Sequence, residues 1–284
     1  MAKLIALVDG SVYSRSVCDH AAWIATRTGS AVELLHVLGR RETGSIPSDL
    51  SGSIALGART TLLEELSAHD EQRSKLAQKR GRAILDDAKA ILEGAGVGTV
   101  TTRLRFGDIV ETVAEFEADA DLVVIGKRGE AADFAKLHLG SNLERIARSS
   151  RKPVFVASRA FKPIERFLIA YDGGTSSMKA VDHVARSPLF AGLACRLLTV
   201  GAETEENRRR LDDARAILGA GGYAVDAAVV PGNPEAVIAR LVEAEGIGLL
   251  VMGAYGHSRI RNLVIGSTTS EMIRSCKIPV ALFR

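Results

Sequence analysis

Residues 3–10 read KLIALVDG and residues 166–173 read RFLIAYDG, so the chain contains two versions of one apolar segment that ends in Asp-Gly. The same offset of 163 residues places Asp-His at 19–20 on Asp-His at 182–183. A unit this long in only two copies is unlike a solenoid, whose repeats are much shorter. The sequence therefore predicts a duplicated domain.

The offset between the two copies becomes smaller further along the chain. LDDA at residues 85–88 recurs at 211–214, an offset of 126, and LVVIG at 122–126 matches LLVMG at 249–253, an offset of 127. The fall from 163 to 127 means that the first copy carries a net 36 additional residues before its LVVIG segment, inserted between Val37 and Leu85.

Within each copy, short runs of Val, Ile and Leu alternate with segments whose apolar residues recur at helical spacing. Runs that are apolar throughout are typical of strands covered on both faces, and alternating strands and helices wind into a parallel sheet. We predict an α/β protein with two tandem doubly wound domains, residues 1–159 and 164–284, each with a five-stranded parallel sheet and helices on both faces. In the second copy the predicted strands are residues 166–171, 195–200, 225–230, 247–253 and 279–283.

The additional residues of the first copy divide into two parts. Residues 39–53, which include a proline and four serines, predict a mobile loop. Residues 59–92 carry an intermittent apolar stripe and predict a helix. The simpler interpretation is a long connecting helix that covers the edge of the sheet, and the alternative is a functional lid or a partner-binding arm.

Composition excludes several classes of protein. The 37 Lys and Arg residues nearly balance 34 Asp and Glu residues, which argues against a nucleic-acid partner. No apolar run approaches the length that spans a bilayer, so no membrane partner is expected. The three cysteines, Cys18, Cys195 and Cys276, form no CxxC pair, which indicates neither a disulfide framework nor a zinc site and favours a cytoplasmic protein.

A glycine motif follows the predicted fourth strand of the second copy. Gly253 ends this strand, Gly256 comes three residues later, and Gly266-Ser267-Thr268 stands before a segment with helical spacing. In an open parallel sheet, ligands bind beyond the carboxyl ends of the strands, and a helix N-terminus favours an anion. The spacing predicts a phosphorylated ligand, and the alternative is an ordinary turn followed by an ordinary helix cap.

Together these features resemble the universal stress protein domain, here in tandem. The resemblance is carried by the aspartate at the end of the first strand, by Gly-x2-Gly-x9-Gly-Ser/Thr after the fourth, and by a Pro-led fifth strand. It covers nearly the whole chain except the 36-residue insert and the hinge between the two copies, expected at residues 158–165. It implies a five-stranded parallel sheet in each copy and a choice between two branches of the family, one that binds ATP and one that lacks the motif and does not.

The resemblance to the ATP-binding branch implies a site in the second copy, with Mg²⁺ or Mn²⁺ as companion of the nucleotide. Asp172 would contact the adenosine end, Val200 would pack on adenine, and Met252 and Gly253 would line the approach to ribose and phosphates. The phosphates would be held by Gly256, Gly266, Ser267 and Thr268. Tyr255 replaces the arginine that the family often has before the second glycine, which leaves Arg259 or Arg261 to supply the positive charge.

The first copy has a less regular version of this site. The corresponding residues are Asp9, Val37, Gly126, Arg128, Gly129, Gly140, Ser141 and Asn142. Its loop between the second and third glycines is ten residues long, and it includes Glu130 and Asp133, whose charges would oppose a phosphate. We rank this site below the second, and the alternative is a degenerate copy that serves only the fold.

No residue near either motif stands out as catalytic, and no metal ligand set is assigned. His20 and His183 recur in the first helix of each copy, where a structural role is favoured over metal binding. We therefore expect an ATP-binding cytoplasmic stress-response regulator with little or slow hydrolysis, acting on an unknown protein partner. The alternatives are a scaffold or carrier of a non-nucleotide ligand and an ATP-using enzyme of the wider nucleotide-binding α/β group.

The Pro-led apolar runs at residues 153–157 and 279–283 bear on assembly. By the resemblance they are edge strands, through which domains of this family commonly dimerise. An uncovered edge strand exposes unpaired backbone groups. We therefore expect the two copies to pair through these strands as an internal pseudo-dimer, while a homodimer, with the insert as a candidate surface, stays open.

Overall fold

The structure, a computed structural model, describes residues 2–39, 56–129, 141–254 and 267–284, and of residues 56–64, 141, 267 and 268 it describes the backbone alone. The first half of the chain alternates strands and helices. In order they are β1 (Lys3–Leu7), α1 (Ser14–Thr28), β2 (Ala31–Leu38), α3 (Leu56–Gly94), β3 (Val100–Phe106), α4 (Ile109–Phe116), the 3₁₀ helix η1 (Glu117–Asp119), β4 (Leu122–Gly126), α5 (Ser141–Ser149) and β5 (Val154–Ala157).

The second half repeats this order. Its elements are β6 (Arg166–Ala170), α6 (Thr175–Arg186), the 3₁₀ helix η3 (Pro188–Phe190), β7 (Ala194–Val200), α7 (Glu205–Ala220), β8 (Val225–Val230), α8 (Pro234–Ala244), β9 (Leu249–Gly253), α9 (Ser267–Ser275) and β10 (Val280–Phe283). The five strands predicted for this copy are present, with their ends within two residues of the prediction.

All ten strands form one sheet in the order β3-β2-β1-β4-β5-β10-β9-β6-β7-β8. Neighbours within each half are parallel, so the predicted α/β fold with parallel strands is confirmed. The winding direction reverses between β1 and β4 in the first half and between β6 and β9 in the second. These reversals are the places where ligands bind in doubly wound sheets.

The two halves meet at the antiparallel pair of β5 and β10. Val154 lies opposite Leu282, and Val156 lies opposite Val280. Each strand therefore covers an edge that the other half would leave open. The final strands of the two copies lie side by side within one chain, at the middle of the sheet.

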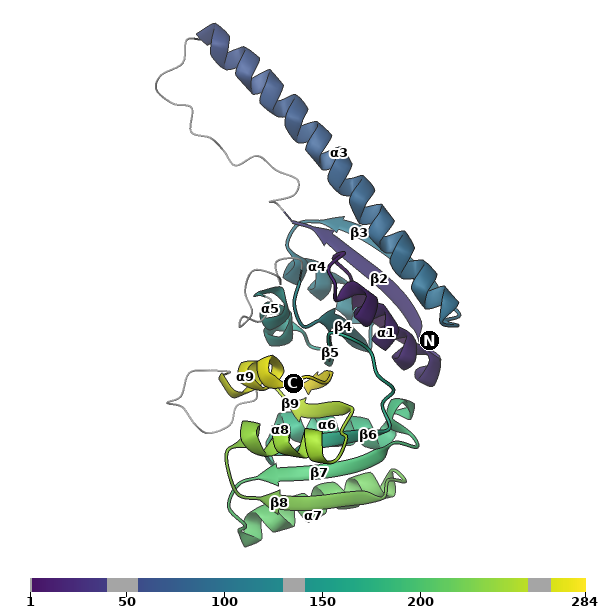
Figure 1. The fold of residues 1–284 in the computed structure, drawn as a ribbon, viewed down its shortest axis with the longest axis vertical. Helices are drawn as coiled ribbons and strands as arrows, with labels where there is room; N and C mark the ends of the chain where they lie inside the picture. The colour runs from purple at the N-terminus through teal and green to yellow at the C-terminus, as the bar shows by residue number, and fades with distance from the viewer. Residues whose placement is uncertain (1, 40–55, 130–140, 255–266) are drawn as a thin grey trace.

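Helices cover both faces of this sheet (Figure 1). Alternate strand residues point to opposite faces: Leu4 and Ala6 enter one core, and Ile5 and Leu7 enter the other. The first core also takes side chains of α1, α3, α6 and α7, and the second takes those of α4, α5, α8 and α9. Each core contains residues of both halves, so burial of apolar surface holds the halves together.

Helix α3 confirms the helix predicted in the insert and extends well beyond the body of the protein (Figure 1). Its carboxyl-terminal part packs on the sheet through Leu85, Ala88 and Leu92, as expected of a connecting helix. Most of its side chains from residue 65 to residue 76 are exposed, with Leu76 at 68% exposure. The predicted loop at 39–53 lies outside the described residues except for Gly39. None of the described helices, α3 included, is both long and apolar enough to cross a membrane.

Candidate functional site

Asp172 follows β6 at the carboxyl edge of the sheet, next to the reversal of winding. Its Oδ1 accepts hydrogen bonds from the N–H of Gly174 at 2.9 Å and from the hydroxyl of Ser177 at 2.5 Å. Both donors belong to the start of α6, so the first turn of this helix fixes the direction of the carboxylate. The residue is exposed, which leaves the second oxygen open to a ligand.

Asp9 has the same arrangement after β1. Its Oδ1 accepts hydrogen bonds from the N–H of Ser11 at 3.0 Å and from the hydroxyl of Ser14 at 3.2 Å, and these donors are equivalent to those of Asp172 in the repeat. A Cβ added at Gly129 would lie 2.9 Å from Asp9 Oδ2. The structure thus brings together Asp9 and Gly129, two residues that the sequence placed in one site.

The glycines that end β4 and β9 lie against the first turns of α1 and α6. A Cβ at Gly253 would lie 2.7 Å from the backbone N of Ser177, and one at Gly126 would lie 2.9 Å from Cβ of Tyr13. Real Cβ atoms essentially never lie within 3.0 Å of another heavy atom, so a side chain at either position would force a neighbour to shift. Packing of the strand end on the helix therefore requires glycine at both positions, a role that the sequence analysis did not include.

The apolar residues assigned to the nucleotide differ in their exposure. Val37 and Val200 are half-buried at the ends of β2 and β7, so each presents part of an apolar side chain at the carboxyl edge. Met252, by contrast, is only 8% exposed, and its side chain belongs to the second core. The side chain of Met252 therefore packs in the core, and only its backbone, next to Gly253, is available to contact a ligand.

Part of the motif lies outside the described residues, namely Gly140, Gly256 and Gly266, together with Glu130, Asp133, Tyr255, Arg259 and Arg261. The backbone shows that α5 begins at Ser141 and α9 begins at Ser267. Thr268 and Asn142 are the second residues of these helices, and Arg128 is half-buried between the two described glycines of the first motif. The prediction that each Gly-Ser pair stands at a helix N-terminus is confirmed for the serines.

The sequence analysis missed Arg210 of α7. A Cβ at Gly173 would lie 3.0 Å from Cδ and 3.2 Å from Nη1 of Arg210, so this guanidinium covers the turn beside Asp172. The equivalent residue in the first half is Ile84 of α3, which covers Gly10 in the same way. The LDDA repeat, which aligns the two helices, carried the signal for this pair.

Tyr171 lies in the field of this cation. Burial raises the pKa of the Tyr171 hydroxyl, and the charge of Arg210 opposes that rise. The hydroxyl of Thr199 donates to the carbonyl oxygen of Tyr171 at 3.0 Å, and in the first half Nδ1–H of His36 donates to Val8 at 2.7 Å. These bonds fix the ends of β6 and β1 just ahead of the two aspartates.

The side chains of His20, Cys18 and Cys195 serve packing. His20 is fully buried, its Nδ1–H donates to the carbonyl oxygen of Ser16 at 2.7 Å, and burial lowers its pKa. Burial raises the pKa of the Cys18 and Cys195 thiols to about 12, which keeps them protonated. In the part of the chain that the structure describes, no three His, Cys, Asp or Glu side chains gather as a metal site.

The model of the universal stress protein family matches residues 1–158 and 196–284. The chain is 37% identical over 287 residues to the universal stress protein Slr1230 of Synechocystis, and the match covers 100% of both chains. A partial match of 27% identity over 81 residues relates 28% of the chain to 50% of the universal stress protein MJ0577 of Methanocaldococcus jannaschii.

Solved structures show the same fold over the whole chain. A universal stress protein from Archaeoglobus fulgidus has a TM-score of 0.74 at 18% identity, covering 99% of this chain and 98% of its own. The protein PA1789 from Pseudomonas aeruginosa has a TM-score of 0.62 at 16% identity, covering 100% of this chain and 92% of its own. At these identities the likeness concerns the fold alone.

Proposed function

Because the chain belongs to the universal stress protein family, we propose that it is a stress-response regulator that binds ATP at the carboxyl edge of its sheet, chiefly in the second half. The observation that supports this most is the fixed carboxylate of Asp172, which recurs as Asp9 with equivalent partners. A carboxylate held in one direction beside an apolar strand end suits the hydroxyls of a ribose whose base packs on that strand.

The second half offers groups for each part of the nucleotide. The exposed side of Val200 would face adenine, and the open oxygen of Asp172 would accept from the ribose hydroxyls. The N-terminus of α9, which begins at Ser267, would face the phosphates with its free N–H groups. Arg210, which also pairs with Glu206, places a guanidinium beside Asp172, where the first half has Ile84. This difference favours the second half as the stronger site.

We propose that hydrolysis is slow. Asp172 is already committed to two hydrogen bonds from α6, and a lone carboxylate next to a sugar is better suited to accept from hydroxyls than to act as a general base. A Mg²⁺ or Mn²⁺ ion that accompanies the nucleotide would be held mainly by phosphate oxygens and water, since the described residues at this edge provide no cluster of carboxylates.

The three cysteines support a reducing compartment, the cytoplasm. All three are buried as free thiols, each in a different element or turn. Buried thiols of this kind contribute apolar packing, and disulfides are not needed to hold this fold. In this setting, occupancy by ATP would change the association of the protein with a partner.

Calorimetric titration of the nucleotide-free protein with Mg-ATP tests the proposal. We expect near one equivalent of tight binding, and a Kd raised by about tenfold or more in Asp172→Asn, because hydrogen bonds to a charged group contribute about 1.5–3 kcal/mol. Asn keeps an oxygen for the bonds from Gly174 and Ser177, so the fold should persist. Asp9→Asn is the matched control and should change the Kd of the tight site little. Absence of binding heat together with no nucleotide released from freshly purified, denatured protein would favour a scaffold for another ligand.

A further inference from the structure

Helices α1 and α6 contact the ends of β5 and β10 in equivalent ways. The hydroxyl of Ser16 donates to the carbonyl oxygen of Ser158 at 2.8 Å. At the equivalent positions, Nζ of Lys179 donates to the carbonyl oxygen of Arg284 at 3.0 Å. The junction of the two halves therefore has two related sides, one beside α1 and one beside α6.

On the α1 side, the segment that joins the halves fills the space between the helix and the neighbouring half. The ring of Phe161 stands edge-on to His20, with 5.1 Å between ring centroids and an interplanar angle of 85°. Cα of Ile164 lies 3.3 Å from the position of a Cβ at Gly248, just ahead of β9. An aromatic and an aliphatic side chain of the chain itself thus occupy this side.

On the α6 side, the equivalent place is a cavity of about 540 Å³. His183, the counterpart of His20, lines it together with Asp121, the counterpart of Gly248. The His183 ring lies 5.0 Å from the ring of Phe283, which lines the cavity as well. The volume is within the range of small-molecule sites, about 300–1,000 Å³. Both halves contribute walls, and the candidate nucleotide residues that the structure describes are not among them.

The cavity carries an excess of positive charge. Among the described residues, its lining includes four cationic side chains, Arg151, Lys179, Arg186 and Arg284, against two side-chain carboxylates, Asp121 and Asp182. Oδ2 of Asp121 accepts from the backbone N–H of Lys3 at 3.1 Å. Within the described ranges, the guanidinium of Arg151 has no carboxylate partner.

The guanidinium of Arg186 likewise has no carboxylate partner among the described residues. Its Nε donates to the backbone oxygen of Asp182 at 3.1 Å, and it forms no ion pair with the described carboxylates. Guanidinium groups without a carboxylate bind carboxylate or phosphate oxygens in a bidentate manner. At the equivalent position α1 has Trp23, so the cation is particular to the side that is open.

We propose that this cavity is a second ligand site, which binds a small organic anion consisting of a flat apolar group with a carboxylate or phosphate. The apolar group takes the place that Phe161 has on the other side, against His183 and Phe283. The anionic group lies between Arg151 of the first half and Arg186 of the second. Because its walls come from both halves, the ligand stabilises their contact.

Phenyl phosphate, benzoate and inorganic phosphate are suitable probes of the full-length protein, with chemical-shift titration as the readout. We expect phenyl phosphate or benzoate to bind more tightly than inorganic phosphate, and the better of the two identifies the anionic group. Arg186→Gln and Arg151→Gln should each weaken this binding by about tenfold, the effect of removing a charge-assisted hydrogen bond. Arg209→Ala, which removes an exposed cation of α7, is the control and should leave it unchanged.

Three results would overturn the proposal. The first is that neither organic probe binds, or that both glutamine variants bind the probe as the wild type does. The second is that inorganic phosphate binds as tightly as phenyl phosphate, because the apolar group would then contribute nothing. The third is displacement of the probe by saturating ATP without any effect of the two glutamine variants, which would place the probe in the nucleotide site.

Discussion

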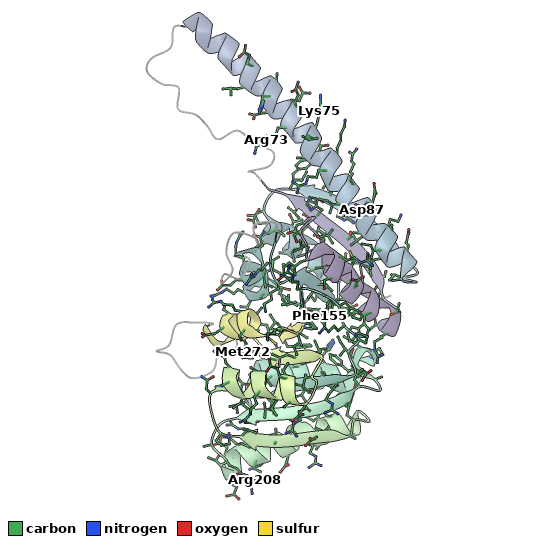
Figure 2. All side chains as sticks on the ribbon, viewed as in Figure 1. Arg73, Lys75, Asp87, Phe155, Arg208 and Met272 are labelled. Atoms are coloured by element: carbon green, nitrogen blue, oxygen red, sulfur yellow. The ribbon has the colours of Figure 1, made fainter. Side chains whose placement is uncertain are left out.

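Phe155 of β5 and Ala281 of β10 occupy equivalent positions in the two copies and lie directly opposite each other in the antiparallel pair. Figure 2 labels Phe155 at the junction between the halves. The flanking pairs, Val154 with Leu282 and Val156 with Val280, exchange with each other when the two copies are interchanged. The junction therefore has the two-fold symmetry of an isologous dimer interface within a single chain. Both side chains enter the first core, where one large ring faces one small methyl group.

Replacing this ring should weaken the junction strongly. Phe155 is fully buried, so Phe155→Ala is expected to lower the free energy of unfolding by about 3–5 kcal/mol. The double variant Phe155→Ala/Ala281→Phe returns one ring to the same layer from the opposite strand and should recover part of the loss. Urea denaturation measures both. If the double variant loses as much free energy of unfolding as the two single variants lose together, the ring cannot be exchanged between the two strands.

The two glycines that end β4 and β9 make a second prediction about stability. Gly253→Ala places a methyl group 2.7 Å from the backbone N of Ser177, so α6 must shift, at a cost of about 1–3 kcal/mol. Gly219→Ala in α7 meets nothing within 4 Å and should instead stabilise the protein by about 0.5–1 kcal/mol. Thermal unfolding of the two variants should therefore shift Tm in opposite directions. Equal shifts would contradict the close packing of Gly253 on α6.

The buried histidine of α1 should make stability depend on pH. Burial lowers the pKa of His20 below its ordinary value, about 6.5, while the unfolded chain keeps that value. Below pH 6.5 the unfolded state therefore binds a proton that the folded state does not, and the free energy of unfolding falls as the pH falls. His183, whose pKa burial also lowers, acts in the same direction.

Urea denaturation at pH 7.5 and pH 5.5 measures this effect. His20→Phe keeps an aromatic ring against Phe155 and Phe161 and should reduce the loss of stability between the two pH values. His69→Gln, on the exposed part of α3, is the control and should leave the loss unchanged. If the wild type and His20→Phe lose the same free energy of unfolding between pH 7.5 and pH 5.5, the pH dependence comes from other groups.

The sequence predicts the elements of this fold well because each follows from a local pattern. The apolar runs near residues 195–200 and 225–230 are strands in the structure, and the stripe over residues 59–92 is a helix. The repeat also places Asp9 and Asp172 at equivalent strand ends. These features depend on periodicity and on neighbours in sequence, which the sequence contains directly.

Contacts between distant elements were beyond these patterns. From the sequence, Gly253 is expected to let a ligand approach the backbone. In the structure its close neighbour is the backbone of Ser177, and this contact depends on how α6 packs on β9. Met252 likewise lies in the core on the face that α8 and α9 cover. The cavity beside His183 depends on how two halves are joined, so no motif within either half could indicate it.

Arg210 provides the last test, since it distinguishes the two halves of the protein. It lies over Gly173 and beside Asp172, and its removal in Arg210→Ala should raise the Kd for Mg-ATP in the second half. The side chain is partly exposed, so we expect a change of about two- to fivefold, the effect of roughly 0.5–1 kcal/mol. Arg208→Ala, on the same helix and also paired with a glutamate, is the matched control and should have no effect.

The reciprocal change, Ile84→Arg, places a cation over Gly10 in the first half and should strengthen binding there, with calorimetry counting a second site. Together, the two variants distinguish the contribution of this charge to Mg-ATP affinity from the contribution of the glycine loop. If Arg210→Ala binds Mg-ATP as the wild type does, the cation has no part in the nucleotide site. We would then attribute the preference for the second half to the loops that precede α5 and α9, whose sequences differ between the two halves.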